Sequence, residues 1–387
     1  MWVLAFWVYS IIGLGLAIAY AWLIRLSLQA WESLPLASAK LPGTAPKVSV
    51  LVPGRNEARH LPESLAALLQ QDYPAESYEV LFIDDHSTDD SLAIAQSMED
   101  PKLRVIELNA YLNPEATIKA YKKKALQLGI QLAKHDIILT TDADCQVSPH
   151  WVQSMVSGLE KNDWQAVTGP VLGHREQNAL QRFQSLDFAG MMLMTAAGLE
   201  SGQFTLGNGA SLGFRRSAFE AVGGYAGNEA FASGDDVFLL RKIAEQFPGK
   251  LGFLKNARAA VRTEMKPDWH SFTQQRLRWG TKNSQAASGW GATLALGVVF
   301  LLSWMILLTP IMVFWVGLPA LVLFAVLLGA KAVSDRLLLG TAAQFFQRRD
   351  LLRAFWLMEA LHIGYIAVVG LLSLVVREYE WKGRRVG

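Results

Sequence analysis

Two long stretches without a charged residue constrain the fold of this chain more than any other feature. Residues 1–24 contain no Asp, Glu, Lys or Arg, and 48 uncharged residues separate Lys282 from Lys331. As an α-helix, the second stretch would be about 72 Å long, against about 30 Å for the hydrocarbon core of a bilayer. We therefore expect two membrane crossings there, with a turn at Pro310, and one crossing near the N-terminus.

The N-terminal stretch reads as an uncleaved anchor, residues 1–26. No basic stretch precedes it, and Arg25 follows where a secretion signal would have small residues. Together with the apolar sequence of residues 287–376, it gives one N-terminal and about three C-terminal transmembrane helices.

The last apolar stretch, from Ala354 to Val376, contains Glu359 and His362. Ionisable residues inside an apolar segment are functional candidates by default. The alternative is interfacial pairing with Arg353, which lies about 9 to 14 Å away along a helix.

Basic residues occur on both sides of this last stretch. One cluster comprises Lys331, Arg336, Arg348, Arg349 and Arg353, and the other, in a basic tail of residues 377–387, comprises Arg377, Lys382, Arg384 and Arg385. The positive-inside rule places both clusters in the cytoplasm, whereas four crossings would separate them. Either one apolar segment is re-entrant or interfacial, or the tail violates the rule.

Charge and cysteine content exclude several classes of protein. With 36 basic and 34 acidic residues, the net charge of +2 is too even for a nucleic-acid partner held by phosphate contacts. The single cysteine, Cys145, permits no internal disulfide and no cysteine-based metal cage. A cytoplasmic active domain joined to membrane helices agrees best with this composition.

Residues 47–265 alternate predicted strands and helices after a linker at residues 41–47. Apolar, β-branched runs at residues 48–52, 80–83, 103–108 and 137–141 predict strands, and helical patterns at residues 61–71, 87–98, 115–133 and 149–160 fall between or after them. This order predicts a doubly wound α/β sheet that binds its ligand at the carboxyl ends of the strands.

Polar residues follow the first two predicted strands. The first ends in Pro53, Gly54, Arg55, Asn56 and Glu57, and the second ends in Asp84, Asp85, His86 and Ser87. We expect a nucleotide to bind where these strand ends meet. The alternative is that Asn56, Asp85 and Ser87 only cap helices, which such residues often do.

Two further acidic pairs are candidates for chemistry. Asp142 and Asp144 follow the fourth strand and point to the same side, as ligands of a hard divalent cation would; the alternative is a solvated strand end. Asp235 and Asp236 precede an apolar helical stretch, where one could act as a catalytic base and the other as a cap. Ordinary N-capping is the alternative there.

A helix at residues 266–286 would place Gln275, Arg278 and Trp279 on one face. An amide, a forked cation and a flat ring can hold a diphosphate and stack on a sugar. The alternative is an amphipathic interface helix, with Trp269 and Trp279 at headgroup depth and Arg276 and Arg278 reaching to its surface.

The ordered motifs PGRNE, FIDDHSTDDS, TDAD, GNGASLGFRR, GDD and QQRLRW, which cover about residues 47–285, resemble membrane-bound members of glycosyltransferase family 2. That family has the GT-A fold and includes cellulose, chitin and hyaluronan synthases and ceramide glucosyltransferase.

The resemblance implies donor-side roles for seven residues. Asp84 and Asp85 would contact the uracil and ribose of a UDP-sugar, and Pro53, Asn56, Glu57, Lys122 and Arg278 would also lie on the donor side. Asp142 and Asp144 would hold Mg²⁺ or Mn²⁺.

On the acceptor side, the resemblance implies roles for Gly207, Asn208, Gln275 and Trp279, and it matches Gly209, Arg215 and Arg216 to the same loop. Asp236 would be the general base, although Asp235 replaces the Glu that usually precedes it and leaves the choice between the two open.

The resemblance implies an inverting, metal-dependent glycosyltransferase of the cell envelope, a multi-pass protein of the cell (inner) membrane with a cytoplasmic catalytic domain. It would move a sugar from a nucleotide-diphosphate donor to a membrane-associated lipid or glycan. Two alternatives are a processive polysaccharide synthase and a catalytically silent, sugar-nucleotide-binding component of a glycan export system.

Overall fold

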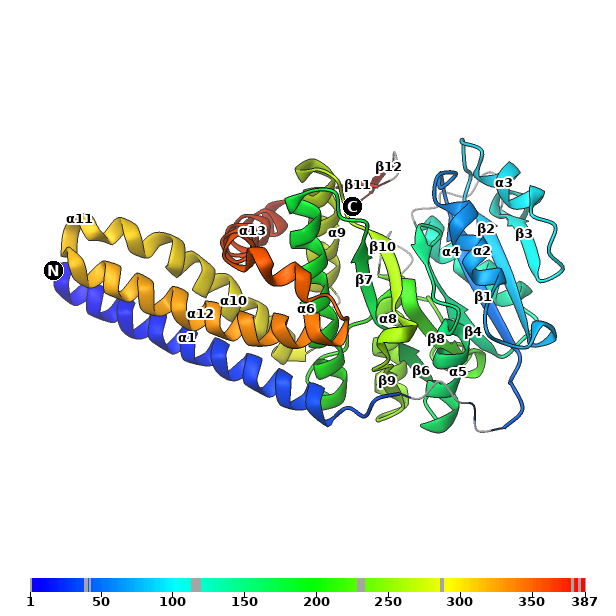
Figure 1. The fold of residues 1–387 in the computed structure, drawn as a ribbon, viewed down its shortest axis with the longest axis horizontal. Helices are drawn as coiled ribbons and strands as arrows, with labels where there is room; N and C mark the ends of the chain where they lie inside the picture. Colours follow the sequence, from blue (N-terminus) through cyan, green and yellow to red (C-terminus); the bar gives the residue numbers. More distant parts are fainter. Residues whose placement is uncertain are drawn as a thin grey trace. The chain divides into compact units, whose positions relative to one another are not determined.

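The computed structural model describes residues 2–37, 41, 43–112, 120–227, 234–285, 289–376, 379–381 and 384–386. The chain forms two compact units (Figure 1). Residues 34–175, 205–265 and 378–387 make up the α/β unit, and residues 1–33, 176–204 and 266–377 make up the helical unit.

The α/β unit is built on a seven-stranded sheet with the strand order β3-β2-β1-β4-β8-β6-β9. The first four of these strands are parallel to one another, β8 is antiparallel to β4 and β6, and β6 and β9 are parallel. Their bounds are β1 Val48–Gly54, β2 Tyr78–Asp84, β3 Leu103–Glu107, β4 Ile137–Thr140, β6 Ala166–Thr168, β8 Leu212–Arg215 and β9 Leu251–Phe253. A second sheet has the order β5-β10-β7, with bounds Cys145–Gln146, Val261–Glu264 and Val171–His174.

Helices cover both faces of the large sheet. Every residue of β1 and β2 is buried, as expected for parallel strands between two helical layers. Leu51 and Leu81 pack with residues of α4 and α8 in one core cluster, which leaves the alternate residues for the opposite face. The helices are α2 Leu61–Leu69, α3 Ser91–Ser97, α4 Tyr121–Leu132, α5 Trp151–Lys161, α7 Arg216–Ala221 and α8 Asp235–Gln246, with 3₁₀ turns η1 Ala75–Ser77, η2 Leu108–Tyr111, η3 Gly209–Ser211 and η4 Ala257–Ala259.

The predicted α/β alternation is confirmed. The four predicted strands correspond to β1 to β4, and the four predicted helices to α2, α3, α4 and α5. Residues 115–119 of the predicted third helix and Pro42 of the predicted linker lie outside the described residues, as do residues 377, 378, 382, 383 and 387 of the basic tail. The described part of that tail contains a short hairpin, β11 Tyr379–Trp381 and β12 Arg384–Val386.

Among the residues that the structure describes, the helical unit contains four helices long and apolar enough to span a membrane, one N-terminal and three C-terminal. Its elements are α1 Trp2–Ser33, α6 Ala179–Ser201, α9 Trp269–Gln285, α10 Gly289–Leu308, η5 Thr309–Met312, α11 Val313–Val316, α12 Leu318–Phe345, η6 Arg349–Ala354 and α13 Phe355–Val375. Pro310 lies in η5, where α10 ends, as predicted. α1 continues seven residues beyond the predicted anchor.

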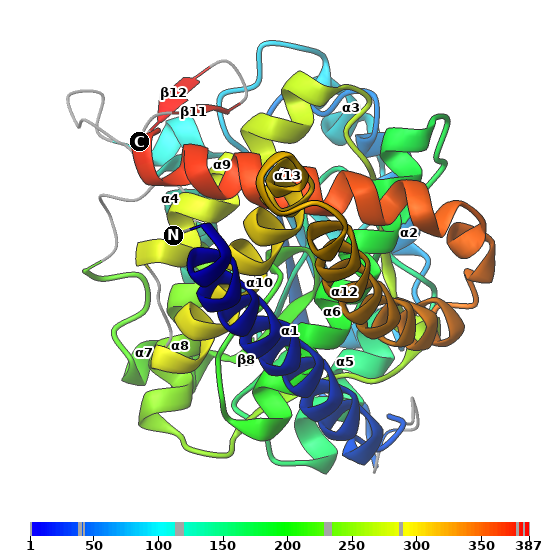
Figure 2. The same cartoon turned by 90° about the vertical axis from the view of Figure 1, so that its left-hand side faces the viewer.

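The helix α6 comes from the middle of the sequence expected to form the catalytic domain, yet it packs against α1 and α12 in the helical unit. The domain boundaries predicted from the sequence stay predictions. They divide the chain into residues 1–26, 47–265, 266–286, 287–376 and 377–387. Within the helical unit, the axes of α1, α10 and α12 run roughly along one direction, whereas the axis of α13 runs across them, as the two perpendicular views show (Figures 1 and 2).

Candidate active site

The loops after β1 and β2 are tied together by side chains. Gly54 pairs with Asp84 at the carboxyl ends of the two strands. Asn56 Oδ1 accepts a 2.7 Å hydrogen bond from the backbone of Thr88, and the Asn56 amide donates to Ser87 Oγ at 3.0 Å. Asn56 has a left-handed φ of 52°, which is uncommon for a residue other than glycine and occurs often at functional sites.

The capping alternative for this loop pair is wrong. The N-cap of α2 is His60 and that of α3 is Asp90, so Asn56, Asp85 and Ser87 cap neither helix. They bond between the loops or to a neighbour instead: Asp85 Oδ1 lies 2.9 Å from His86 Nδ1. The two loops meet because β1 and β2 pair as parallel strands. The spacing of residues in the sequence does not predict that pairing.

Asp84 is buried, with one oxygen held in place and one without a partner. Its Oδ2 accepts a 3.1 Å bond from the backbone of Ser87. In the described part of the chain, its buried Oδ1 has no hydrogen-bond partner. An unsatisfied buried acceptor is costly, so this strand end is a place where a ligand donor would be favourable. Glu57, also buried, lies 3.1 Å from His60 Nδ1, and Pro53 is part of β1.

The acidic pair after β4 is brought together as predicted. Each of Asp142, Asp144 and Cys145 offers one ligand atom, and these three atoms lie within 4.8 Å of one another. Burial raises the pKa of the Cys145 thiol well above its usual range, and the two carboxylates raise it further. The thiol is therefore neutral, and hard cations prefer oxygen ligands. Asp142 and Asp144 are the residues that could hold a divalent cation.

Lys122, at the start of α4, joins this pair to α8. Its ammonium nitrogen lies 2.7 Å from Asp142 Oδ1 and 3.4 Å from Asp235 Oδ2. Burial lowers the pKa of Lys122, but Asp142 and Asp235 raise it by more, so the net shift is upward and the side chain stays charged. One lysine thus compensates two of the carboxylates collected at this edge of the sheet.

Asp235 and Asp236 are the first two residues of α8, and both are buried. The N-cap is Gly234, with a φ of 87° and no capping side chain, so neither aspartate is the N-cap residue, although Asp236 bonds to one amide of the first helical turn. Asp236 Oδ2 accepts a 3.1 Å bond from the Gly209 amide, and its Oδ1 accepts a 2.7 Å bond from the Val237 amide. Asp236 is hydrogen-bonded to the 207–209 loop through Gly209, and Asp235, which also borders that loop, pairs with Lys122.

The loop 207–209 approaches this cluster through Gly209. A Cβ on Gly209 would lie 3.3 Å from Asp235 Oδ2 and 3.5 Å from Lys122 Nζ. Asn208 points its side-chain oxygen to the Ala210 amide, 3.0 Å away, and a Cβ on Gly207 would lie 2.1 Å from a methyl carbon of Leu240. The close approach of backbone to carboxylates explains why a glycine stands at residue 209.

Arg215 and Arg216 lie away from the cluster. Arg215 pairs with Ile137, at the start of β4, whereas Asp142 follows its end. Its guanidinium lies 2.9 Å from Glu160, and Arg216 donates to the carbonyl oxygens of Ala133 and His135. Both arginines bind neighbouring loops, so the acceptor-side role implied for them is wrong.

The QQRLRW motif lies on α9, in the helical unit. Gln275, Arg278 and Trp279 are all partly buried. The Trp279 ring stacks on Phe188 of α6, with 5.8 Å between ring centroids. The QQRLRW motif therefore belongs to the helical unit, whereas the acidic residues Asp142, Asp144, Asp235 and Asp236 belong to the α/β unit.

Arg276, which the sequence suggested would reach to the membrane surface, is 3% exposed. Its guanidinium lies 2.8 Å from Asp187 of α6 and 4.5 Å from the centre of the Trp279 ring. Sequence analysis missed Asp187, because a carboxylate 89 residues from its partner gives no local signal.

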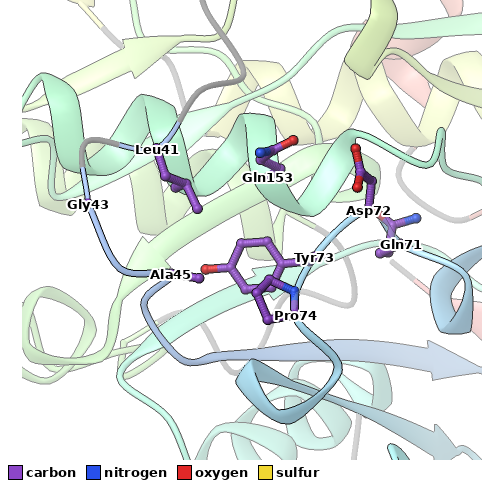
Figure 3. A pocket seen from close by; sticks show the side chains of 8 residues that line it. All are labelled: Leu41, Gly43, Ala45, Gln71, Asp72, Tyr73, Pro74 and Gln153. Carbon is purple, nitrogen blue, oxygen red and sulfur yellow. The ribbon is translucent and has the colours of Figure 1, made fainter.

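A hollow at the other side of the α/β unit has no part in this cluster. It is lined by Leu41, Gly43, Ala45, Gln71, Asp72, Tyr73, Pro74 and Gln153 (Figure 3). Two polar side chains that line it are hydrogen-bonded to the backbone: Gln71 donates to the Ser148 carbonyl, and Tyr73 donates to the Pro46 carbonyl. None of the predicted site residues lines it.

The fold resembles that of a solved glycosyltransferase. The mannosyltransferase PcManGT from Pyrobaculum calidifontis, determined with GDP-Man and Mn²⁺, superimposes with a TM-score of 0.59 at 21% identity, over 96% of this chain and 100% of that one. The α/β unit is thus a GT-A-like glycosyltransferase fold. More specifically, the chain belongs to glycosyltransferase family 21, whose model matches residues 5–387. The expected assignment to family 2 is not confirmed.

Two curated relatives match parts of the chain. A probable glycosyltransferase, YdaM of Bacillus subtilis, is 28% identical over 247 residues, which cover 62% of this chain and 55% of that protein. The undecaprenyl-phosphate 4-deoxy-4-formamido-L-arabinose transferase of Pseudomonas fluorescens is 33% identical over 145 residues, covering 36% and 39%. The chain thus spans about half or less of these relatives' length.

Proposed function

We propose that this protein is an inverting glycosyltransferase that moves a sugar from a nucleoside-diphosphate donor, a UDP-sugar in the first instance, to a lipid acceptor in the membrane. The observation that carries the proposal is the position of Lys122 between Asp142 and Asp235, with Asp236 bonded to Gly209. Three separate segments thereby place charged groups, and a fourth places a backbone amide, near the carboxyl end of β4, where α/β folds bind ligands.

The donor set at Asp142 and Asp144 is suited to a divalent cation. The two carboxylates are partly exposed and close together, and the adjacent thiol is neutral. Mg²⁺ and Mn²⁺ are bound in this way, through one or two carboxylates and the phosphates of the substrate. When bound, such an ion would neutralise charge on the departing diphosphate. We propose Asp84, Asp85, Pro53, Asn56, Glu57 and Lys122 for the rest of the donor site.

We propose Asp236 as the general base. For an acceptor that attacks through a hydroxyl, Asp236 would take its proton as that oxygen attacks the sugar carbon from the side opposite the diphosphate, so that the bond to the diphosphate breaks and the configuration inverts. A lipid phosphate is already ionised and would attack without this proton transfer. Asp235 is the weaker candidate because its carboxylate is the one paired with Lys122, at 3.4 Å. Asp236 accepts from the amides of Gly209 and Val237 and is thereby bonded to the loop proposed for the acceptor, at Gly207 and Asn208.

A single transfer to lipid is favoured over processive synthesis. One relative, by its name, acts on undecaprenyl phosphate, which is a lipid. The helical unit, with its four apolar helices, would keep the protein at the inner membrane beside such an acceptor, with the α/β unit in the cytoplasm. Gln275, Arg278 and Trp279 are proposed for the donor diphosphate and the acceptor.

The test uses the full chain in lipid nanodiscs. Purified protein is incubated with UDP-glucose, UDP-galactose, UDP-N-acetylglucosamine or GDP-mannose, with undecaprenyl phosphate or diacylglycerol, in Mn²⁺ or in EDTA. We expect release of UDP that needs both the lipid and Mn²⁺, with one sugar per lipid in the product. Long products would favour the polysaccharide synthase. UDP binding without release from any donor would favour the silent export component.

A further inference from the structure

The fourth long apolar helix, α13, does not run with the other three. Figure 1 shows α1, α10 and α12 lengthwise and α13 nearly end-on, and Figure 2, turned by 90°, shows α13 from the side. The N-terminus and α11 lie together at one end of the helical unit, away from α13 (Figure 1).

Contacts along α13 identify the elements that it crosses. Near its start, Glu359 lies 2.9 Å from Lys331 of α12. Further along, Gly370 faces Phe300 of α10, so closely that a Cβ there would lie 2.6 Å from the ring. Near its end, Ser373 lies against Gly280 of α9, where a glycine Cβ would be 3.1 Å away.

The contacts between α13 and α9 indicate the depth of α13 in the membrane, because α13 meets α9 at two places. Tyr365 lies 5.4 Å from the Arg276 guanidinium, measured to the ring centre, and Ser373 lies beside Gly280. Since α9 precedes α10, it lies at the side of the membrane from which α10 departs. Ser373, near the end of α13, therefore still lies beside the residues that precede α10, on the side from which α10 departs.

A buried ionic network lies at the same level. Lys331, with no exposed surface, contacts Asp335, Glu359 and His362, and Asp335 accepts a hydrogen bond from Tyr20 of α1. His362 also lies 3.8 Å from Asp187, the partner of Arg276. The expected pairing of Glu359 and His362 with Arg353 is thus wrong for Glu359, whose described partner is Lys331 on a neighbouring helix.

The apolar lengths place this network near a boundary of the hydrocarbon. From Leu318 to Lys331, α12 rises about 20 Å, and from Trp2 to Tyr20, α1 rises about 27 Å, against about 30 Å for the hydrocarbon core. Both helices therefore cross most of the apolar layer before they reach the charges. Ionised groups are far less costly at the interface than at the centre of a bilayer.

From this geometry we propose that α13 lies along the membrane interface and does not cross the bilayer. The partner of its exposed face is the hydrocarbon just beneath the lipid headgroups. That face is apolar, with Trp356 68%, Val368 55% and Val375 76% exposed, whereas Met358, Glu359 and Ile363 are buried against the protein. A helix with one apolar lipid face and one protein face is suited to lie in that plane.

Three crossings follow from this placement. α1 brings the chain to the side where residue 34 begins the α/β unit, and α10 and α12 lead away from that side and back. Residues after α13 then remain on the side of the α/β unit. Both basic clusters lie on that same side, in agreement with the positive-inside rule. The conflict that four crossings created is removed, and the inference does not depend on catalytic activity.

The test is the accessibility of single cysteines in sealed membrane vesicles of both orientations. Replacing Cys145, the only cysteine, by Ala gives the background. Lys161→Cys marks the α/β unit, Phe314→Cys marks the turn between α10 and α12, and Gly387→Cys marks the tail. With a membrane-impermeant maleimide, we expect Gly387→Cys to react from the same side as Lys161→Cys. Reaction from the side of Phe314→Cys would show a fourth crossing and overturn the proposal.

A depth measurement separates an interfacial helix from a re-entrant one, which would also return the tail. Nitroxide labels at Leu357→Cys and Leu371→Cys, both exposed apolar positions, are compared by their collisions with oxygen and with a water-soluble nickel chelate. We expect the same shallow depth for both. A helix along the membrane normal would separate them by about 21 Å, and a difference approaching that value, or one deep label, would refute the interfacial placement.

Discussion

The ammonium group of Lys122 donates a 2.7 Å hydrogen bond to Asp142, one of the two residues proposed to hold a divalent cation. A cation that binds Asp142 must therefore compete with the lysine. We expect Lys122→Met, which keeps the length of the side chain without its charge, to bind Mn²⁺ about tenfold more tightly in the absence of nucleotide.

Titration of Mn²⁺ followed by electron paramagnetic resonance measures this affinity directly. Lys124→Met is the control, because Lys124 is exposed and two residues along the same helix. Donor turnover should fall in Lys122→Met even though metal affinity rises, since the carboxylates lose their fixed counter-charge. Equal Mn²⁺ affinity in the two variants would show that Lys122 and the cation do not share Asp142.

The sequence was sufficient for the elements whose signal is local. Buried parallel strands leave continuous apolar runs, so β1 to β4 could be found, and the acidic residues after β4 could be predicted as a cluster because side chains alternate along a strand. Asn56 and Asp236 were harder. Each resembled a helix cap, and only the pairing of loops distant in sequence revealed that Asn56 bonds to Thr88 and Asp236 to Gly209.

The helical unit was predictable in its apolar lengths but not in its packing. Hydropathy identifies α13 as long enough to cross a membrane, yet the direction of a helix depends on tertiary contacts such as that of Glu359 with Lys331. The place of α6 was missed for a related reason: its sequence has no long uncharged stretch, and its packing partners α1 and α12 are distant in sequence.

The buried pair of Arg276 and Asp187 should be important for stability. Asp187→Asn keeps the shape of the side chain but leaves the Arg276 charge without its carboxylate, and breaking a buried ion pair costs about 3 to 5 kcal/mol. We expect a clearly lower thermal midpoint in nanodiscs. Glu200→Gln, at an exposed position of the same helix, is the control. A midpoint equal to that of the control would mean that the pair contributes little.

Glu79 should make the α/β unit sensitive to acid. Burial raises the pKa of Glu79, but hydrogen bonds from the Lys134 amide, Ser49 and Arg104 lower it by more, and the net shift is downward. A lowered folded-state pKa means that the stabilisation is present above the unfolded-state pKa, about 4.3, and is lost as the pH falls through the folded-state value.

Glu79→Gln should therefore unfold at a lower temperature than the wild type at pH 7, with a loss of about 1 to 3 kcal/mol from imperfectly satisfied donors. The difference between the two proteins should shrink as the pH falls below 4. Glu76→Gln, at an exposed position, controls for the change in net charge. A difference that is constant from pH 7 to pH 3 would rule out the assigned linkage.

The choice of base between Asp235 and Asp236 can be decided by the paired substitutions Asp235→Asn and Asp236→Asn. Asp236→Asn cannot accept the acceptor proton, and we expect the initial rate of UDP release at saturating donor to fall by about 10²- to 10⁴-fold. UDP binding with Mn²⁺ should stay near that of the wild type, because the substitution leaves the proposed metal ligands Asp142 and Asp144 and the pairing of Lys122 with Asp142 unchanged. Asp235→Asn removes the carboxylate that lies 3.4 Å from Lys122 and leaves the closer pairing with Asp142, and we expect about a tenfold loss of rate.

Stability must be measured beside rate, because the two oxygens of Asp236 accept from the amides of Gly209 and Val237. An asparagine keeps one acceptor and turns an NH₂ group toward the other amide, which costs about 1 to 3 kcal/mol. A folded Asp236→Asn protein with normal UDP affinity and almost no turnover supports its role as the base. Turnover within a few-fold of the wild type would refute that role. An inactive Asp235→Asn protein beside it would assign the base to Asp235.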